Sequence, residues 1–282
     1  MGAVGKQKGD LEMIYRSKGG VVALFISLMI FVILGGCARP NPANTVNIAG
    51  SSSVQPLSEE LANAFMKENS RISINVAGGG SSAGIKAVRE GTADIGASSR
   101  ELERDEKNGL MVIPIAIDGI ALVVNPENRV NNLTLEQVRR IYAGEITNWK
   151  EVGGKEGVIN AFTREEGSGT RGAFEDLVMK DSHISSRVGV QNATGSLRTA
   201  VAADPQAIAY ISLGNVNNSV NVVAVDGILP GRETIKNGSY KLARFFFYLT
   251  REEPRGMARN FIDFVLSPEG QRIVGQDFVP AV

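Results

Sequence analysis

The stretch Thr163-Arg164-Glu165-Glu166-Gly167-Ser168-Gly169-Thr170 joins a predicted strand to a predicted helix. Residues 158–162 before it are apolar except for Asn160, and residues 171–179 after it carry apolar side chains at helical spacing. A turn from a strand into a helix points free backbone N–H groups outward at the positive end of the helix macrodipole. The position of this stretch therefore predicts a place where an anion can bind.

The residue types within the stretch fit the same role. Gly167 and Gly169 have no Cβ, so the backbone can come close to a ligand. Ser168 and Thr170 add hydroxyl donors, and Arg164 adds a planar, permanently charged fork that matches a tetrahedral oxyanion. These groups predict a phosphate-like ligand. Taken alone, the stretch also fits an ordinary Gly-Ser turn beside a surface arginine.

The same order of strand, small hydroxylic loop and helix occurs twice earlier in the chain. Residues 50–53, Gly-Ser-Ser-Ser, form the first loop, and Ser53 is the expected N-cap of the helix that follows. Residues 78–82, Gly-Gly-Gly-Ser-Ser, form the second loop. The predicted strands and helices around these loops are 46–49, 54–69, 72–76 and 83–90. Three such loops would surround an anion with amides and hydroxyls but offer no obvious nucleophile or metal ligand, which describes a receptor better than an enzyme.

Residues 1–36 predict an export signal that is not part of the fold. Basic residues precede an uncharged apolar run, residues 21–34, which is shorter than the roughly 20 residues of a membrane span. Leu34-Gly35-Gly36-Cys37 then resembles the lipobox of bacterial lipoproteins, in which the cysteine is acylated. Cys37 is the only cysteine, so a disulfide within the chain is impossible. The alternatives are an uncleaved membrane anchor and an accidental cysteine.

The mature chain would begin at Cys37, and residues 37–44 predict a short extended tether. The remainder is long enough for two lobes with separate cores. Of 30 basic and 30 acidic residues, four basic and two acidic ones lie in residues 1–36, so the mature net charge is about −2. This balance argues against a nucleic-acid partner. We also expect no metal and no cofactor.

The remaining pattern alternates strands and helices, which indicates an α/β fold with largely parallel sheets. Residues 112–117 and 120–124 predict two buried strands separated by Asp118-Gly119. Ser196, near a predicted helix start, is a further candidate anion contact, although an N-cap role alone explains it. The other expected strands are 207–211, 220–225 and 242–249. Three further helices are expected: one begins with a capping box at Thr134 to Gln137, one covers residues 254–266, and one begins with Ser267 as its N-cap.

Four small, hydroxylic motifs follow one another along the chain, at residues 49–56, 78–84, 94–99 and 164–170. In order and spacing, this set resembles the phosphate-binding proteins of phosphate ABC transporters (PstS-like), and the resemblance runs from about Thr45 to the C-terminus. It implies a type II periplasmic-binding-protein fold, in which two α/β lobes are joined by two crossing strands and hold dehydrated phosphate in the cleft between them. The phosphate ligands that it implies are Ser52, Ser53, Ser81, Ser99, Arg164, Ser168, Gly169 and Thr170.

The resemblance also implies an organisation and a role. Lobe one is expected from residues 45–121 and 243–282, and lobe two from residues 125–240, with 120–124 and 245–249 as the crossing strands. The implied role is that of an exported, lipid-anchored receptor, on the outer face of the cell membrane or in the periplasm. Such a receptor captures inorganic phosphate without covalent change and delivers it to the permease of an ABC transporter. We expect it to be a monomer.

One position departs from the family pattern. Many members have an aspartate where this chain has Ser99, and a carboxylate there can accept the proton of hydrogen phosphate and repel fully ionised sulfate. The basis of selectivity therefore stays open, with Glu165, Glu166 and Asp94 as candidate acceptors. The first alternative keeps the fold but changes the ligand to sulfate or another oxyanion, or makes the protein a phosphate sensor.

The second alternative is an enzyme. Gly80-Ser81-Ser82-Ala83-Gly84 fits the G-x-S-x-G nucleophile elbow, lies between a predicted strand and a predicted helix, and is followed downstream by His183. A lipid-anchored serine hydrolase with Ser82 as nucleophile would have these features. Against this interpretation, three consecutive glycines make an accidental match easy, and residues 182–185 predict an exposed turn.

Overall fold

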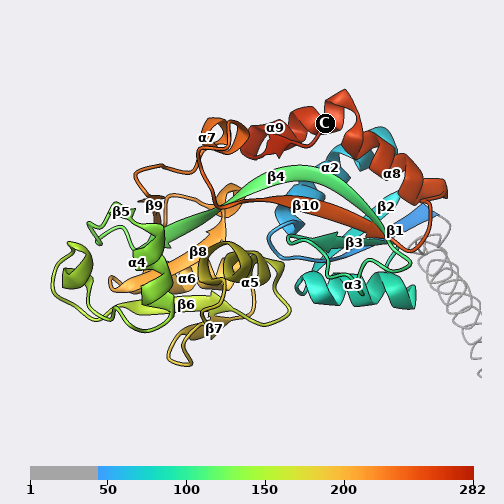
Figure 1. The fold of residues 1–282 in the computed structure, drawn as a ribbon. Helices are drawn as coiled ribbons and strands as arrows, with labels where there is room; N and C mark the ends of the chain where they lie inside the picture. The colour runs from blue at the N-terminus through green and yellow to red at the C-terminus, as the bar shows by residue number, and fades with distance from the viewer. Residues whose placement is uncertain (1–43) are drawn as a thin grey trace, which may run out of the picture. The chain divides into compact units, whose positions relative to one another are not determined.

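Figure 1 shows the computed structural model, in which residues 44–282 are described and belong to one compact unit. The predicted signal peptide, Cys37 and nearly all of the tether lie outside the described residues. Strands in two mixed sheets, with helices packed on them, make an α/β fold of two lobes. Between residues 44 and 282, no helix has the length and apolar character needed to cross a membrane.

The first lobe consists of β1 (Thr45–Gly50), α2 (Gln55–Glu68), β2 (Ser73–Gly78), α3 (Ser81–Glu90), β3 (Ile95–Ser98), β4 (Met111–Val124), β10 (Ala243–Thr250), α8 (Gly256–Leu266), α9 (Pro268–Asp277) and β11 (Val279–Pro280). Its sheet has the order β2-β1-β3-β10-β4, and β11 pairs with β4. Helices α2, α8 and α9 cover one face of this sheet, while α3 covers the other (Figure 1). Strands β1, β2 and β3 are parallel, so the loops that follow them leave the sheet at the same edge.

The second lobe consists of β5 (Asn132–Leu133), α4 (Leu135–Tyr142), η2 (Trp149–Val152), β6 (Asn160–Arg164), α5 (Gly169–Phe174), the π-helix η3 (Glu175–Met179), β7 (Gly189–Gln191), α6 (Thr194–Ala203), β8 (Ala207–Ser212), η4 (Leu213–Asn215), β9 (Asn221–Val225) and α7 (Arg232–Lys236). Its sheet has the order β4-β8-β6-β7, and β9 pairs with both β4 and β5. The parallel strands β6 and β7 each lead into a loop and a helix, so two further loops face the first lobe.

Strand β4 belongs to both sheets. Most of it pairs with β10, and residues 120–124 pair with β8. Asp118 and Gly119 lie inside this continuous strand, so the prediction of two strands separated by this pair was wrong. Asp-Gly pairs are common in turns. Here the buried Arg244 guanidinium on β10 forms an ion pair with the Asp118 carboxylate, so the aspartate can lie inside a buried strand. All pairings of β4 and β10 are antiparallel, so the prediction of largely parallel sheets was wrong for the centre of the molecule.

Two of the predicted helix starts are confirmed and one is wrong. The Thr134 hydroxyl accepts a hydrogen bond from the Gln137 N–H, and Gln137 Oε1 accepts one from the Thr134 N–H, which completes the capping box of α4. Ser267 caps α9, which has Pro268 in its first turn. Helix α2, however, begins after Val54, and no side chain caps it. The Ser53 hydroxyl is not a cap because it has partners in the second lobe.

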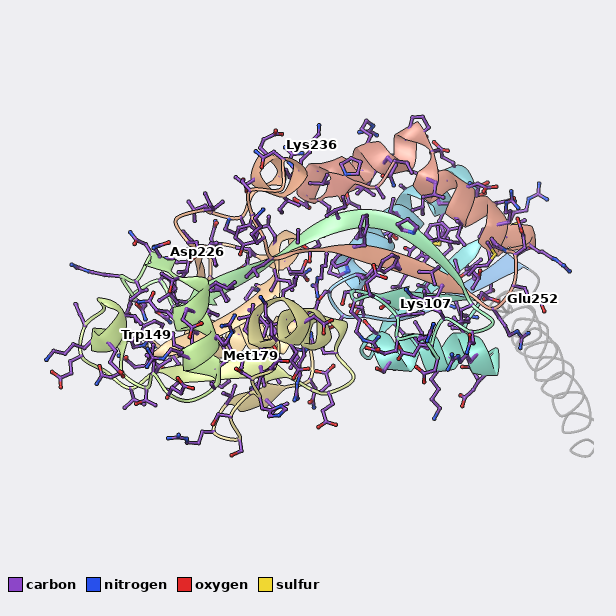
Figure 2. All side chains as sticks on the ribbon, viewed as in Figure 1. Lys107, Trp149, Met179, Asp226, Lys236 and Glu252 are labelled. Carbon is purple, nitrogen blue, oxygen red and sulfur yellow. The ribbon has the colours of Figure 1, made fainter. Side chains whose placement is uncertain are left out.

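Each lobe has its own hydrophobic core. Phe246 and Phe261 are fully buried in the first, between the sheet and helices α2 and α8. Trp149 and Met179 are fully buried in the second, and Figure 2 labels both on the elements that surround its sheet. Full burial of a large apolar side chain contributes roughly 1.5–3 kcal/mol. Two separately packed cores therefore hold the hydroxylic loops that lie between them.

Candidate functional site

Hydroxyl groups from both lobes meet where the loop after β1 reaches the second lobe. Ser53 Oγ lies 2.7 Å from Thr170 Oγ1 and 3.0 Å from Thr194 Oγ1. Ser52 Oγ lies 3.3 Å from the same Thr194 oxygen. Ser53, Thr170 and Thr194 are all buried. Because a hydroxyl can both donate and accept, this cluster consists of neutral groups that can turn their protons toward an anion.

A second set of hydroxyls extends the cluster within the first lobe. Ser51 Oγ donates to Ser99 Oγ over 2.8 Å, and the Ser99 N–H donates to Ser81 Oγ over 3.1 Å. Gly169 of the second lobe lies against them, since a Cβ at this position would be 2.2 Å from Ser81 Oγ and 2.7 Å from Ser99 Oγ. Glycine alone permits this approach, so the start of α5 lies directly on the hydroxyls of the first lobe.

Arg164 is the charged member of the cluster and is only 2% exposed. Its Nη1 donates to Thr194 Oγ1 over 3.0 Å, while Nε and Nη2 donate to the two oxygens of Glu165 over 2.9 Å and 2.8 Å. The Glu165 side chain is 25% exposed, so water reaches the carboxylate but hardly reaches the guanidinium. The fork therefore has a fixed orientation, with a neutral hydroxyl on one side and a partly hydrated counter-ion on the other.

The eight residues predicted as anion contacts lie together at this junction, in the order Ser52, Ser53, Ser81, Ser99, Arg164, Ser168, Gly169 and Thr170 along the chain. Ser168 caps α5, because its Oγ accepts a hydrogen bond from the Arg171 N–H. The three loops recognised from the sequence therefore converge on one buried set of donors.

Sequence reasoning missed Ser51 and Thr194. Thr194 follows β7 and begins α6, so it occupies the same place in the strand, loop and helix order as the recognised loops. That order was the available signal, but it was assigned to Ser196. The Ser196 hydroxyl instead donates to the Ala193 carbonyl and accepts from the Ala193 N–H, which explains it as a local helix-start contact.

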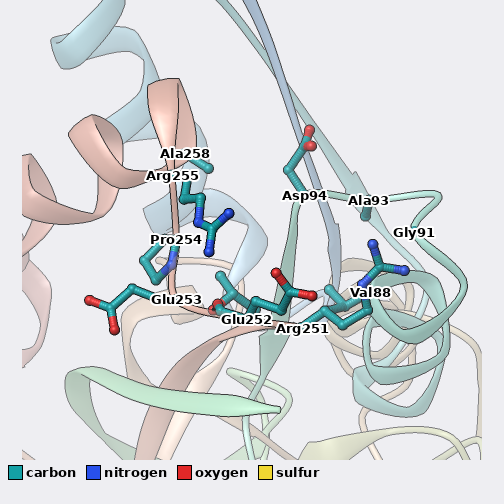
Figure 3. Close-up of a pocket in the computed structure, with 11 residues that line it drawn as sticks. Val88, Gly91, Ala93, Asp94, Arg251, Glu252, Glu253, Pro254, Arg255 and Ala258 are labelled. Carbon is teal, nitrogen blue, oxygen red and sulfur yellow. Dashed lines mark hydrogen bonds between the residues drawn. The ribbon is translucent and has the colours of Figure 1, made fainter. Parts of the chain in front are cut away.

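Of the three candidate carboxylate acceptors, Glu165 contacts the cluster, through the two bonds that it accepts from Arg164. Glu166 is exposed. Asp94 Oδ2 accepts from the Asn47 N–H over 2.8 Å and lines a surface pocket of about 250 Å³. Figure 3 shows Asp94 in this pocket together with charged residues such as Arg251. Glu165 is therefore the carboxylate positioned to interact with an anion at Arg164.

Ser82 lacks the surroundings of a catalytic nucleophile. In the described part of the chain, its Oγ accepts from Arg100 Nη2 over 3.2 Å, and Arg100 itself donates two bonds to the Glu106 carboxylate over 2.6 Å and 2.8 Å. His183 is exposed, as predicted, and lies in an irregular segment. Within residues 44–282, no group of three or more His, Cys, Asp or Glu side chains could hold a metal ion.

The two lobes contact each other directly around the cluster. The Ser82 N–H donates to the Gly167 carbonyl over 3.2 Å, and Asn215 Nδ2 donates to the Ser53 carbonyl over 3.1 Å. Together with the contacts of Ser53 and Gly169, these bonds join the loops after β1 and β2 of the first lobe to the second lobe. Any separation of the lobes would break them, so the arrangement seen here is a closed one.

The chain is similar to known proteins over most of its length. Residues 38–269 match the sequence model of the family described as PBP superfamily domain. The phosphate-binding protein PstS of Bacillus subtilis strain 168 is 30% identical over 244 residues, which cover 84% of this chain and 81% of that protein.

Solved structures are similar in both sequence and fold. One from Clostridium perfringens, described as a phosphate ABC transporter substrate-binding protein with bound phosphate, has a TM-score of 0.82 and 42% identity and covers 85% of this chain and 100% of that one. An ABC-type phosphate transport receptor from Vibrio cholerae has a TM-score of 0.69 and 35% identity and covers 83% of this chain and 99% of that one. The fold is therefore that of a type II periplasmic binding protein.

Proposed function

The chain belongs to the PBP superfamily and, within it, to the family of phosphate-binding proteins called PstS, and from this premise we propose that it is the substrate-binding component of a phosphate ABC transporter. It captures inorganic phosphate without covalent change and delivers it to the permease. The observation that carries the proposal is the environment of Arg164, a buried guanidinium that donates to the Thr194 hydroxyl. That hydroxyl in turn meets the Ser52 and Ser53 hydroxyls of the first lobe. One fixed charge and many neutral donors suit an anion that has been removed from water.

The proposed ligand set is the predicted one with Thr194 added. Arg164 supplies the charge-assisted bond, and Ser52, Ser53, Ser81, Ser99, Ser168, Gly169 and Thr170 supply hydroxyl and amide donors. In the closed arrangement the hydroxyls bond to one another. Binding exchanges these neutral bonds for bonds to an anion, which are roughly twice as strong. The exchange favours a ligand with several oxygens, since each oxygen can accept from more than one hydroxyl.

Glu165 is proposed as the acceptor that distinguishes hydrogen phosphate from sulfate. This chain has Ser99 where many relatives have an aspartate, and a serine cannot repel a fully ionised anion as a carboxylate would. The Glu165 carboxylate is held next to the fork by two bonds from Arg164. It can accept the proton of hydrogen phosphate but would face an unprotonated oxygen of sulfate, which is repulsive.

Residues 45–121 and 243–282 are proposed as lobe one, and residues 125–240 as lobe two. The proposed crossing strands are residues 120–124 of β4 and residues 245–249 of β10. A pair of strands between separately packed lobes permits hinge closure. The bonds between the lobes would form as the ligand is enclosed, which lets a permease distinguish the loaded receptor from the empty one.

The protein is proposed to be an exported monomer anchored by lipid on Cys37 to the outer face of the cell membrane. Residues 1–36 would be removed, and residues 37–44 would tether the fold at no more than about 3.5 Å per residue from the membrane. The several acyl chains of a lipoprotein hold firmly, whereas one chain binds only marginally. A Cys37→Ser variant should be misprocessed or released from membranes, and cleaved variant protein that stays on membranes would contradict the anchor.

Calorimetric titration of the purified protein with phosphate, sulfate and molybdate tests the function. We expect one site, tightest for phosphate, with no product formed on prolonged incubation. Tighter binding of sulfate or molybdate would assign the same fold to another oxyanion. Labelling of Ser82 by an active-serine probe would support the hydrolase alternative instead. A sensor would bind phosphate equally well, so transport by cells that lack the protein separates a sensor from a carrier.

A further inference from the structure

The short helix η4 of the second lobe contacts the first-lobe loop that carries Ser53. Asn215 Nδ2 donates to the Ser53 carbonyl over 3.1 Å, and the Asn215 carbonyl accepts from Arg198 Nη1 on α6 over 2.6 Å. Gly214 lies against the Phe278 ring of the first lobe, since a Cβ there would be 2.2 Å from the ring. The contacts of η4 therefore fix the backbone of a loop whose hydroxyls belong to the anion site.

The start of η4 is held by a buried ion pair at the crossing of the lobes. Asp118 Oδ1 accepts from Ser212 Oγ over 2.9 Å and from the Leu213 N–H over 3.1 Å. Asp118 Oδ2 accepts from Arg244 Nε and Nη2 over 3.2 Å and 3.0 Å. Both side chains are almost completely buried. A continuous series of contacts thus leads from Arg244 on β10 through Asp118 and η4 to Ser53.

Arg244 has more donor capacity than its partners use. Among residues 44–282, its Nη1 is the buried side-chain nitrogen that has no hydrogen-bond partner. Burial lowers the pKa of the Arg244 guanidinium, Asp118 opposes this effect, and the positive charge of Arg164 lowers the pKa further. An anion at Arg164 would relieve this repulsion, so the charge of Arg244 favours anion binding.

We propose that Asn215 is a positioning residue of the anion site, that it sets the Ser53 loop for the ligand, and that the Arg244–Asp118 pair holds η4 in place for this task. The proposal rests on the proposed function, because it concerns the same site. The bond from Asn215 to the Ser53 carbonyl crosses between the lobes and is lost when they separate. It therefore stabilises the closed, ligand-holding arrangement specifically, and its loss should appear as faster ligand release.

The test compares Asn215→Ala with the isosteric Asn215→Asp by titration with inorganic phosphate. Alanine removes one neutral hydrogen bond, which corresponds to a loss of affinity between about twofold and tenfold. Aspartate keeps the shape but places a carboxylate against the Ser53 carbonyl and adds a negative charge near the anion. We expect it to weaken binding about tenfold more than alanine does. A packing role alone predicts the reverse order, because aspartate fills the space that alanine leaves empty.

Asn125 offers a matched control. It is a buried asparagine of the second lobe whose Nδ2 donates to the carbonyls of Val201 and Ala202 over 3.1 Å and 2.9 Å. Asn125→Ala and Asn125→Asp should lower the thermal midpoint of the ligand-free protein and leave the phosphate affinity within about twofold. If the Asn125 and Asn215 variants change affinity equally, the effect comes from general destabilisation and the proposal is wrong.

The ion pair is tested separately with the double variant Asp118→Asn/Arg244→Gln, in which neutral amides can replace the charged contacts. Its ligand-free thermal midpoint should stay close to that of the parent, because neutral replacement of a buried ion pair is often harmless. Its phosphate affinity should nevertheless fall between about twofold and tenfold, because a neutral amide at position 118 holds Ser212 and the Leu213 N–H of η4 less strongly than the carboxylate does. Unchanged affinity in this variant and in both Asn215 variants overturns the inference.

The proposed function fails independently of this inference. A parent protein that binds no phosphate removes the function and the inference together. A parent that binds phosphate, with an Arg164→Ala variant that does not, upholds the function whatever the Asn215 variants do. Should Asn215→Asp fail to fold, Asn215→Ala and the double variant decide the question, since one removes the bond to Ser53 and the other removes the charges.

Discussion

Two buried arginines, Arg164 and Arg244, differ in the exposure of their counter-ions. Glu165 follows Arg164 in the chain, and its side chain is 25% exposed. Asp118 is separated from Arg244 by 126 positions, and its side chain is 0% exposed. Glu165 forms one side of a cluster of mobile hydroxyl protons, whereas Asp118 is also held by Ser212 and Leu213.

The difference indicates which arginine can exchange partners. Water can hydrate the Glu165 carboxylate when an anion competes for the guanidinium, so the loss of a contact there is partly compensated. No such compensation exists for Asp118, because an unpaired charge in a buried site has a cost of several kcal/mol. We therefore interpret Arg164 as the arginine that binds the ligand and Arg244 as the arginine that maintains the structure around it.

Removal of one partner of the fully buried pair should have the largest effect. Arg244→Gln leaves Asp118 charged in a buried site, and we expect the free energy of unfolding to fall by about 3–5 kcal/mol. The double variant Asp118→Asn/Arg244→Gln should recover most of this loss. Urea unfolding of the three proteins without ligand measures both values. Equal stability of the single variant and the parent would show that the pair is not a structural unit.

Removal of the exchangeable arginine should affect binding more than folding. Arg164→Ala loses a charge-assisted bond, a loss of about 1.5–3 kcal/mol in the free energy of phosphate binding, and leaves the anion without its charge partner. Ser168→Ala, in which one neutral hydroxyl is lost, should cost about 1 kcal/mol. Calorimetric titration gives the order. Stronger binding by Arg164→Ala than by Ser168→Ala would mean that the site is organised around another group.

The loops that carry the site were predictable from local sequence. In Thr163 to Thr170 the strand, the glycines, the hydroxyls and the arginine are neighbours in the chain, so their chemistry can be recognised without the fold. The same holds for the capping boxes and for the helices with apolar residues at regular spacing. The convergence of the three loops could also be predicted, because each loop follows a strand of an α/β fold and precedes a helix.

The remainder depends on contacts between distant residues. Asp118-Gly119 resembles a turn until Arg244, a residue of another strand, is known to lie opposite. Asn215 has no motif around it, and its role depends on the Ser53 carbonyl 162 positions away. Ser53 was expected to cap α2, because the sequence does not reveal that Thr170 and Thr194 reach its hydroxyl. Tertiary contacts replaced the local preference in each case.

Neutralisation of the exposed counter-ion should change selectivity by an intermediate amount. Glu165→Gln removes the charge that repels sulfate and the acceptor for the proton of hydrogen phosphate, so the ratio of phosphate to sulfate affinity should fall about tenfold. Glu166→Gln, at the adjacent exposed position, is the matched control and should leave the ratio unchanged. Titrations with both anions measure it. An unchanged ratio in Glu165→Gln would assign the discrimination to another group.

A third arginine pair, Arg100 and Glu106, is the one of the three in which water reaches both partners, so it should have the smallest effect. Their side chains are 13% and 18% exposed, and they are joined by bonds of 2.6 Å and 2.8 Å. The hydrogen bond from Arg100 is the main cause that lowers the pKa of Glu106, while burial opposes it.

Because the carboxyl pKa is lower in the folded protein, the stability that this pair adds is complete above the ordinary glutamate value of about 4.3 and is lost as pH falls through the lower folded value. Water screens the pair, so we expect a contribution below about 1 kcal/mol.

Glu106→Gln should therefore have a lower thermal midpoint than the parent at pH 7, and the difference should shrink toward pH 3. Glu101→Gln, which removes a more exposed partner of Lys107, is the control and should show no difference at either pH. A Glu106→Gln difference that is as large at pH 3 as at pH 7 would mean that the carboxylate charge is not what stabilises this loop, and exposure would then fail to rank the three arginine pairs.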